Sequence, residues 1–174
     1  MRILVVIDMQ NDFITGPLGT KEAEGIVDKV AEKIREHDYH QIFYTMDSHS
    51  YLEYPSSQES KTIPPHCIFG ASGWELHPKI QNVLPPNARQ YCKGQFASMH
   101  LARAIRNEVF TCEDVTIELV GLCTDICVIA NAMMLKAILP EANITVDSSC
   151  CAGTTPEKHQ AALDVMKSCQ ITVV

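Results

Sequence analysis

The sequence has 174 residues, of which 46% are hydrophobic, and a formal net charge of −7 at pH 7. A chain of this length is typically one domain with its own core, and we expect a single domain over residues 1–174. The negative charge and the lack of a Lys/Arg cluster argue against nucleic acid as a partner. The longest apolar stretch, residues 126–139, contains Asn131 and Lys136 and is shorter than the ~18–20 residues that cross a bilayer, so no membrane insertion is expected.

The eight cysteines do not indicate a disulfide framework. The chain begins with Met1 and Arg2 and runs at once into an apolar segment, without the cleavage region of a signal peptide. Disulfides are rare in reducing compartments. We therefore expect a reduced chain in the cytoplasm.

The N-terminal part shows two apolar runs that each end in an aspartate. Residues 3–7 precede Asp8, and residues 41–46 precede Asp47. Such runs are typical of strands that are buried on both faces of a parallel sheet. Between them, apolar residues at helical spacing predict a helix over residues 22–36.

Residues 48–86 differ from the rest of the chain. They contain six prolines, three histidines and the only tryptophan, and they show little periodicity. Loops of this length in compact domains are usually functional or disordered. Because the segment mixes Phe69 and Trp74 with histidines and acids, we predict an ordered insertion that forms part of an active site.

The remaining part alternates predicted strands and helices. The strands are expected at residues 88–92, 115–120, 143–146 and 170–174. The helices are expected at residues 96–106, 124–139 and 156–167, the last from a capping box at Thr154–Glu157. This alternation predicts an α/β fold, with a three-layer, doubly wound, mainly parallel six-stranded sheet and helices on both faces, as in Rossmann-like proteins.

The stretch Gly121–Val128 places a cysteine just after a predicted strand. Cys127 lies at the start of the following helix, with Thr124 as its expected N-cap and Asp125 in its first turn. Backbone N–H groups and the helix dipole favour an anion there, which indicates a reactive thiolate. The alternative is that Cys127 is one more small buried apolar residue.

Asp8, Lys93 and Cys127 each follow a different predicted strand. The carboxyl ends of parallel strands share one edge of a sheet, so these side chains can meet in one crevice. A carboxylate can take the thiol proton, a lysine can stabilise the resulting charges, and the thiolate can attack a carbonyl carbon. Together the three residues predict a thiol hydrolase, although singly Asp8 could cap a turn and Lys93 could be a solvated charge.

Asp47 and His49 lie two residues apart in an extended stretch and so point to the same side. His66 and Glu59 of the insertion can complete a set of nitrogen and oxygen ligands, with room for water or substrate. These residue types predict one divalent metal ion. The alternative is that they are ordinary surface residues of a loop.

Three motifs resemble those of the isochorismatase-like cysteine hydrolases. They are the segment Val5–Phe13, Lys93 and the segment Gly121–Val128, in the order and spacing of that family. Residues 47–49 and 59–73 further resemble the nicotinamidase (pyrazinamidase) branch, because the metal-ligand motif is largely absent from the isochorismate-cleaving and carbamoyl-hydrolysing branches. The resemblance covers essentially the whole chain.

The resemblance implies a role for each matching residue. The implied catalytic triad is Asp8, Lys93 and Cys127. The implied metal ligands are Asp47, His49, His66 and, as in some members, Glu59. The implied oxyanion hole is formed by the backbone N–H groups of Cys123 and Cys127, beside a non-proline cis peptide at Leu122–Cys123. The implied substrate contacts are Phe13, Phe96 and Trp74, of which Phe96 is commonly tyrosine and Trp74 commonly a small residue in the family.

The implied reaction is the metal-dependent hydrolysis of nicotinamide to nicotinate and ammonia through a thioester on Cys127, an activity of NAD salvage. The implied cofactor is one divalent ion, foremost Zn²⁺ with Fe²⁺ or Mn²⁺ as alternatives, which orients the substrate through its ring nitrogen. We expect a homo-oligomer of a size that the sequence does not define.

Two other functions remain open at this point. One is a metal-independent amide or carbamoyl hydrolase of the same family with another small substrate, and the other is a non-catalytic metal-binding or scaffold domain. A nucleotide-binding fold is disfavoured because no Gly-rich phosphate loop follows the first strand.

Overall fold

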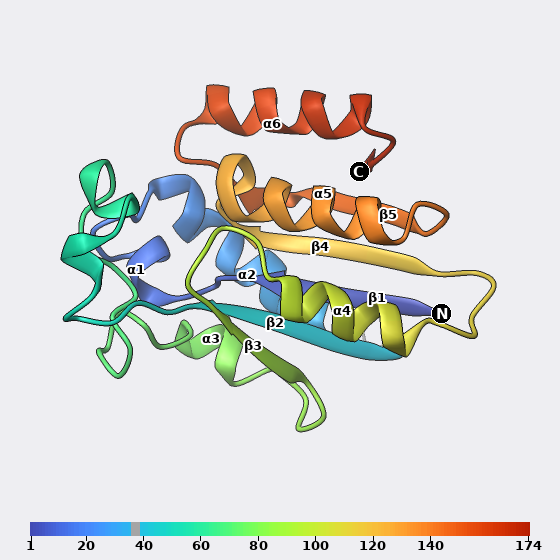
Figure 1. The fold of residues 1–174 in the computed structure, drawn as a ribbon, viewed down its shortest axis with the longest axis horizontal. Coiled ribbons are helices and arrows are strands. Elements are labelled where there is room, and N and C mark those ends of the chain that lie inside the picture. The colour runs from blue at the N-terminus through green and yellow to red at the C-terminus, as the bar shows by residue number, and fades with distance from the viewer. Residues whose placement is uncertain (36–38) are drawn as a thin grey trace.

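The computed structural model describes residues 1–35 and 39–174, and its centre is a six-stranded sheet (Figure 1). The strands run in the order β3-β2-β1-β4-β5-β6, and each neighbouring pair is parallel. Their bounds are β1 (Arg2–Ile7), β2 (Gln41–Asp47), β3 (Arg89–Lys93), β4 (Thr116–Leu122), β5 (Asn143–Ala152) and β6 (Thr172–Val173). The predicted doubly wound sheet is confirmed, and these strands are wholly rather than mainly parallel.

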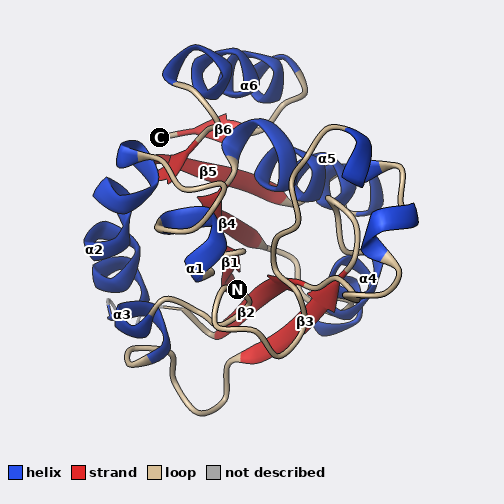
Figure 2. Ribbon diagram, turned by 90° about the vertical axis from the view of Figure 1, so that its left-hand side faces the viewer, coloured by secondary structure: helices blue, strands red, loops and turns tan. Residues whose placement is uncertain are grey.

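Helices cover both faces of the sheet, as Figure 2 shows. One face carries α1 (Asn11–Ile14), α2 (Lys21–Arg35) and α3 (Pro78–Gln81). The opposite face carries α4 (Met99–Glu108), α5 (Ile129–Ile138) and α6 (Pro156–Ser168). None of the helices in the described ranges is long and apolar enough to cross a bilayer.

The central strand β1 explains why the sheet has a core on each side. Leu4 and Val6 pack in the cluster that contains the buried residues of α2, whereas Ile3, Val5 and Ile7 pack in the cluster beneath α4, α5 and α6. All five side chains are 0% exposed. Successive side chains of a strand point to opposite faces, so a strand buried on both faces requires the uninterrupted apolar run in the sequence.

The helix α2 is amphipathic and is capped by a side chain that precedes it. Its buried residues are Ala23, Ile26, Val27, Val30, Ala31 and Ile34. The Thr20 Oγ1 accepts a hydrogen bond from the Ala23 N–H at 3.0 Å, which satisfies one of the free donors of the first turn. The helix is described to Arg35, and its predicted last residue, Glu36, lies outside the described residues.

Several elements differ in extent from the prediction, and the reason is clear for β5 and α4. Strand β5 continues past residue 146 to Ala152, although Asp147 interrupts its apolar pattern. The Asp147 carboxylate is accommodated because the Lys33 Nζ of α2 lies 2.7 Å from its Oδ2. Helix α4 begins at Met99 rather than at residue 96, because the Ser98 hydroxyl accepts the Leu101 N–H at 3.2 Å and so forms the N-cap.

Two predicted helix caps are wrong by one residue. Helix α6 is capped by Thr155, whose Oγ1 accepts the Lys158 N–H at 3.2 Å, and not by Thr154. After β4 the chain enters η3 (Thr124–Val128), a turn with π-helical hydrogen bonding whose N-cap is Cys123 rather than Thr124. The hydroxyl of Thr154 instead donates to Asp125, and that of Thr124 lies within hydrogen-bond distance of His159.

The insertion of residues 48–86 packs beyond the carboxyl ends of β1 and β2 (Figure 1). It contains α3 and two short 3₁₀ helices, η1 (Tyr54–Ser56) and η2 (Glu59–Lys61). Its far end is joined to the segment after β1, since the Asn11 N–H donates to Glu75 O at 3.0 Å and the His77 N–H donates to Met9 O at 2.9 Å. The insertion therefore lies against the same sheet edge as Asp8.

Two glycines provide a matched test of this packing. Gly121 has φ +120°, and a Cβ there would lie 2.1 Å from the Ile7 carbonyl oxygen, so Gly121→Ala should destabilise the fold by about 2 kcal/mol or more. Gly25 of α2 has open space around it, so Gly25→Ala should stabilise the fold by about 0.5–1 kcal/mol. Urea unfolding of both variants measures the two changes. Equal effects of the two substitutions would contradict the close approach of β4 to β1.

Candidate active site

Three side chains from separate strands meet at the carboxyl edge of the sheet. Asp8 follows β1, Lys93 is the last residue of β3, and Cys127 lies in η3 after β4. The Lys93 Nζ lies 2.6 Å from Asp8 Oδ2 and 3.4 Å from Cys127 Sγ. All three residues are buried. The structure thus brings together the three reactive side chains that the strand pattern pointed to.

The carboxylate of Asp8 is fixed by its backbone and by one hydroxyl of β2. Asp8 has φ +47°, a left-handed conformation that is uncommon for residues with a Cβ. The Thr45 Oγ1 donates to Asp8 Oδ1 at 2.6 Å and accepts the Asp8 N–H at 3.1 Å. Because one carboxylate oxygen is held by Thr45, the other is directed to Lys93.

The electrostatic environment raises the pKa of the Cys127 thiol. Burial raises the pKa of its thiol, the neighbouring Asp8 charge raises it further, and Lys93 only partly opposes them. These effects oppose the helix N-terminus, which favours the thiolate. A carboxylate that accepts the thiol proton would therefore assist ionisation at this position.

Asp8 has the properties of that base. Burial raises the pKa of its carboxyl group above the usual range, although Lys93 acts in the opposite direction. A carboxylate with a raised pKa is a better proton acceptor near neutral pH. Burial alone would lower the pKa of Lys93, but Asp8, Cys127 and Asp47 raise it well above its usual value, so Lys93 is a permanent cation.

The turn that carries Cys127 is anchored on both sides. The peptide between Leu122 and Cys123 is cis, as the family resemblance implied. The Thr124 Oγ1 and the His159 Nδ1 of α6 lie 2.8 Å apart. The Asp125 carboxylate accepts hydrogen bonds from the N–H and the hydroxyl of Thr154, at 2.8 and 2.7 Å. These contacts fix the turn that carries Cys127 against the segment that follows β5.

Asn131 is a site residue that the sequence did not reveal as one. It is 1% exposed and lies one helical turn after Cys127. Its amide donates to Cys127 O at 2.7 Å and to Phe96 O at 3.1 Å, and its Oδ1 accepts the Ser98 N–H at 2.9 Å. It thereby connects the loop after Lys93 to the turn that carries Cys127. Its signal in the sequence was a polar amide inside the apolar stretch 126–139.

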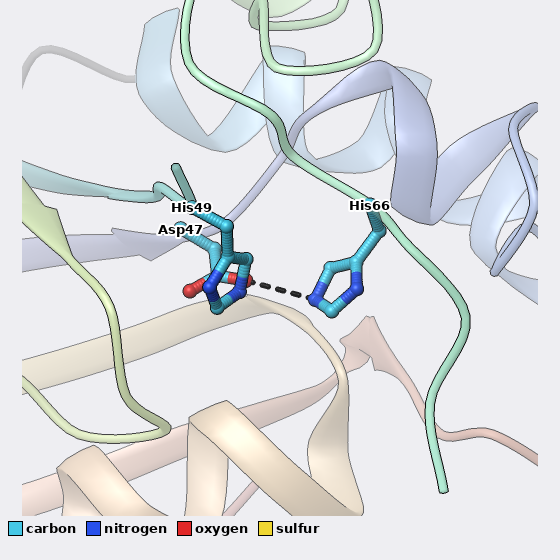
Figure 3. A group of neighbouring side chains, drawn as sticks. All are labelled: Asp47, His49 and His66. Carbon is cyan, nitrogen blue, oxygen red and sulfur yellow. Dashed lines mark hydrogen bonds and ion pairs between the residues drawn. The ribbon is translucent and has the colours of Figure 1, made fainter. Parts of the chain in front are cut away.

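Asp47, His49 and His66 form a second group of side chains (Figure 3). The ligand atoms of Asp47, His49 and His66 all lie within 4.8 Å of one another. The Asp47 Oδ2 lies 2.9 Å from His49 Nε2 and 3.1 Å from His66 Nε2. Glu59 of η2 contributes a carboxylate at 3.6 Å from His49 Nε2 and 3.8 Å from His66 Nε2. Three of the four predicted ligands therefore form one close group, and Glu59 lies beside its two histidines.

The orientation of His66 suits a metal ion. Its Nδ1 lies 2.9 Å from the Pro64 carbonyl oxygen, which can only accept a hydrogen bond, so the Nδ1 carries a proton and the Nε2 is the nitrogen that faces Asp47. The Nε2 lies 3.1 Å from Asp47 Oδ2, a separation that a shared proton or a metal ion can bridge. The mixed nitrogen and oxygen donor set fits Zn²⁺, Fe²⁺ or Mn²⁺.

The two groups border one pocket. Its volume is about 270 Å³, and it is lined by Asp47, Glu59, His66, Cys123, Cys127 and the aromatic rings of Phe13 and Phe96, among others. The Lys93 Nζ lies 3.3 Å from Asp47 Oδ1, so one cation contacts both groups. The pocket therefore combines two aromatic side chains with Asp47, His66 and the Cys127 thiol.

Trp74 lies outside the lining of this pocket. Its indole N–H donates to Ser48 Oγ at 2.7 Å, and its ring lies 4.8 Å from that of Phe69. In this position it supports the segment beside Asp47 rather than the pocket wall itself.

Known proteins resemble this chain over essentially its whole length. An isochorismatase domain matches residues 2–174. The nicotinamidase/pyrazinamidase of Mycobacterium tuberculosis is 26% identical over 196 residues, with 100% of this chain and 98% of that protein covered. The pyrazinamidase of Pyrococcus horikoshii, solved in complex with zinc, has 29% identity and a TM-score of 0.81, with 99% and 98% of the two chains covered. The pyrazinamidase/nicotinamidase of Streptococcus mutans has 26% identity and a TM-score of 0.83, with 100% of both chains covered.

The match extends over the parallel sheet, the insertion and the turn that carries Cys127, and it confirms the resemblance seen in the three motifs. The chain belongs to the isochorismatase family.

Proposed function

We propose that the chain is a metal-dependent amidohydrolase that converts nicotinamide, or a closely related pyridine or pyrazine carboxamide, to the acid and ammonia. The observation that carries the proposal is the contact of Lys93 with Asp8, Cys127 and Asp47. It joins a thiol, its base and a set of metal ligands in one pocket. The similar proteins named nicotinamidase/pyrazinamidase, which match the chain over its whole length, support this substrate class.

Substrate binding follows from the pocket wall. The planar ring lies between the side chains of Phe13 and Phe96, where aromatic contacts favour it over an aliphatic amide. Asp47, His49, His66 and Glu59 would hold the divalent ion. When bound, that ion would act as a Lewis acid toward a ring nitrogen of the substrate and so would help to orient the carboxamide.

The first half of the reaction forms a thioester. Asp8 takes the proton of the Cys127 thiol, and Sγ attacks the carboxamide carbon. The backbone N–H groups of Cys123 and Cys127 stabilise the oxyanion, with ~3 kcal/mol expected per donor. Asp8 then returns the proton to the departing ammonia, and the carbon–nitrogen bond breaks.

The second half regenerates the enzyme. Asp8 takes a proton from water as the water oxygen attacks the thioester carbon, the carbon–sulfur bond breaks and the carboxylic acid leaves, and Asp8 returns the proton to the Cys127 thiolate. Lys93 stays charged throughout and stabilises the carboxylate and the thiolate in turn. Each proton that Asp8 accepts is therefore returned within the same half-reaction.

Replacement of the nucleophile tests this role directly. Cys127→Ala should reduce ammonia release from nicotinamide by about 10⁴-fold or more, since no other group forms the thioester. Cys169→Ala at the end of α6 removes another free thiol and should leave the rate unchanged. Turnover of nicotinamide by the Cys127 variant at the normal rate would overturn the proposal.

Metal removal tests the second group of residues. Treatment with a chelator should abolish ammonia release, and added Zn²⁺, Fe²⁺ or Mn²⁺ should restore it. His66→Ala should lower both metal content and turnover, whereas His100→Ala, an exposed histidine of α4, should change neither. Full activity of the metal-free protein would instead favour a metal-independent hydrolase of the family.

The pH profile tests the link between Lys93 and Asp8. Lys93 lowers the pKa of Asp8, so Lys93→Gln should raise that pKa and shift the acidic limb of kcat/KM to higher pH, because the base form of Asp8 then appears only at higher pH. The variant should also lose about 10²-fold or more in kcat/KM. A limb that stays in place, or moves to lower pH, would contradict the assignment of Asp8 as the base.

A further inference from the structure

We infer that Gln10 and Asp12, two residues that follow the catalytic aspartate, are positioning residues that hold the metal ligands in place. The inference rests on the metal site of the proposed function. Neither residue contributes an atom to the ligand cluster. Their hydrogen bonds nevertheless reach the backbone of the segments that carry all three members of that cluster.

Gln10 holds Asp47. Its side chain is 0% exposed, its Oε1 accepts the Asp47 N–H at 2.7 Å, and its Nε2 donates to Asp47 O at 2.9 Å. The same Nε2 donates to Trp74 O at 2.8 Å. An amide that meets both the N–H and the C=O of one residue fixes the orientation of that residue, and with it the direction of the Asp47 carboxylate.

Asp12 holds the two histidines through a single peptide. Its Oδ2 accepts the N–H of Cys67 at 2.7 Å, and Cys67 directly follows His66. The carbonyl of Cys67 in turn accepts the His49 N–H at 3.0 Å. One carboxylate oxygen therefore anchors the point at which the segments carrying His66 and His49 meet.

The backbone at this point requires an anchor. Cys67 has φ +45° and is 0% exposed, so it adopts a conformation that residues with a Cβ rarely take. Without Asp12, its buried N–H would lack a partner, and the peptide could relax toward an ordinary conformation. That change would move His66, the preceding residue.

The surrounding sequence leaves room for the Asp12 carboxylate. A Cβ on Gly73 would lie 2.1 Å from Asp12 Oδ1, and a Cβ on Gly16 would lie 2.5 Å from the same atom. Both neighbours of the carboxylate are thus glycines, and any larger side chain would displace it. The site is built around Asp12 from two separate loops.

These contacts give the segment after β1 two functions. Asp8 acts on the thiol, while Gln10 and Asp12 orient Asp47, His49 and His66. Groups that orient metal ligands typically change metal affinity by about 10- to 100-fold when they are replaced. We expect an effect of that size on the affinity for Zn²⁺.

The experiment measures the Zn²⁺ affinity of the full chain by competition with a chromophoric chelator. Asp12→Ala and Gln10→Ala should each weaken Zn²⁺ binding by about 10- to 100-fold. Asp12→Asn, which loses the charge but keeps an oxygen acceptor of the same reach, should bind Zn²⁺ nearly as well as the unmodified chain. Asp28→Ala, which removes an exposed carboxylate paired with Lys79, is the matched control and should not alter the affinity.

The variants separate positioning from charge and from global stability. Unfolding of the zinc-free variants by urea shows whether each still folds, and Asp12→Asn keeps the test valid if Asp12→Ala does not. Zn²⁺ binding by Asp12→Asn as weak as by Asp12→Ala would assign the effect to charge and overturn the inference. Unchanged affinity in Asp12→Ala and Gln10→Ala would overturn it as well, while the proposed function would stand. If the unmodified chain itself binds no Zn²⁺, the metal dependence of the proposed function fails together with this inference.

Discussion

One buried ammonium group, that of Lys93, connects every part of the site. It lies within 3.4 Å of Asp8, Asp47 and Cys127, which come from three different places in the fold. A buried charge is costly unless its partners are close and well oriented. The fold therefore has to bring the ends of β1, β2 and β3 and the turn after β4 into a fixed relation. The proposed base, nucleophile and metal ligands are consequently parts of one electrostatic unit and not two neighbouring sites.

The segment directly after β1 holds the insertion in place. In a few residues it provides Asp8 for the chemistry and forms backbone hydrogen bonds to the far end of the insertion. An insertion with little regular structure can hold metal ligands because its backbone polar groups find partners on a rigid strand end. The sheet thus fixes the positions of side chains in a loop that has little regular structure of its own.

Much of the fold follows from the sequence because its signals are local. The doubly buried strands β1, β2 and β4 read as apolar runs, and α2 shows helical spacing. The meeting of Asp8, Lys93 and Cys127 could be predicted as well, since parallel strands present their carboxyl ends on one edge. The convergence of Asp47, His49, His66 and Glu59 was expected from residue type and from the family resemblance.

Other features depend on partners that are distant in the sequence. Strand β5 continues through Asp147 because Lys33 of α2 neutralises it, and no local pattern contains that information. Thr124 was expected to cap a helix, yet its hydroxyl meets His159. Asn131 forms hydrogen bonds with backbone groups of a loop more than thirty residues away in the sequence. The pKa of Cys127 is raised by burial and by Asp8, and the local sequence contains neither effect.

Mass spectrometry of the protein, quenched in acid during turnover of nicotinamide, tests whether the reaction passes through a thioester on Cys127. A nicotinoyl group is expected on the peptide that contains Cys127, bound as a thioester that hydroxylamine removes, and no such group is expected on the Cys127→Ala variant. Turnover without any acyl group on Cys127, or with the group on another residue, would contradict this expectation.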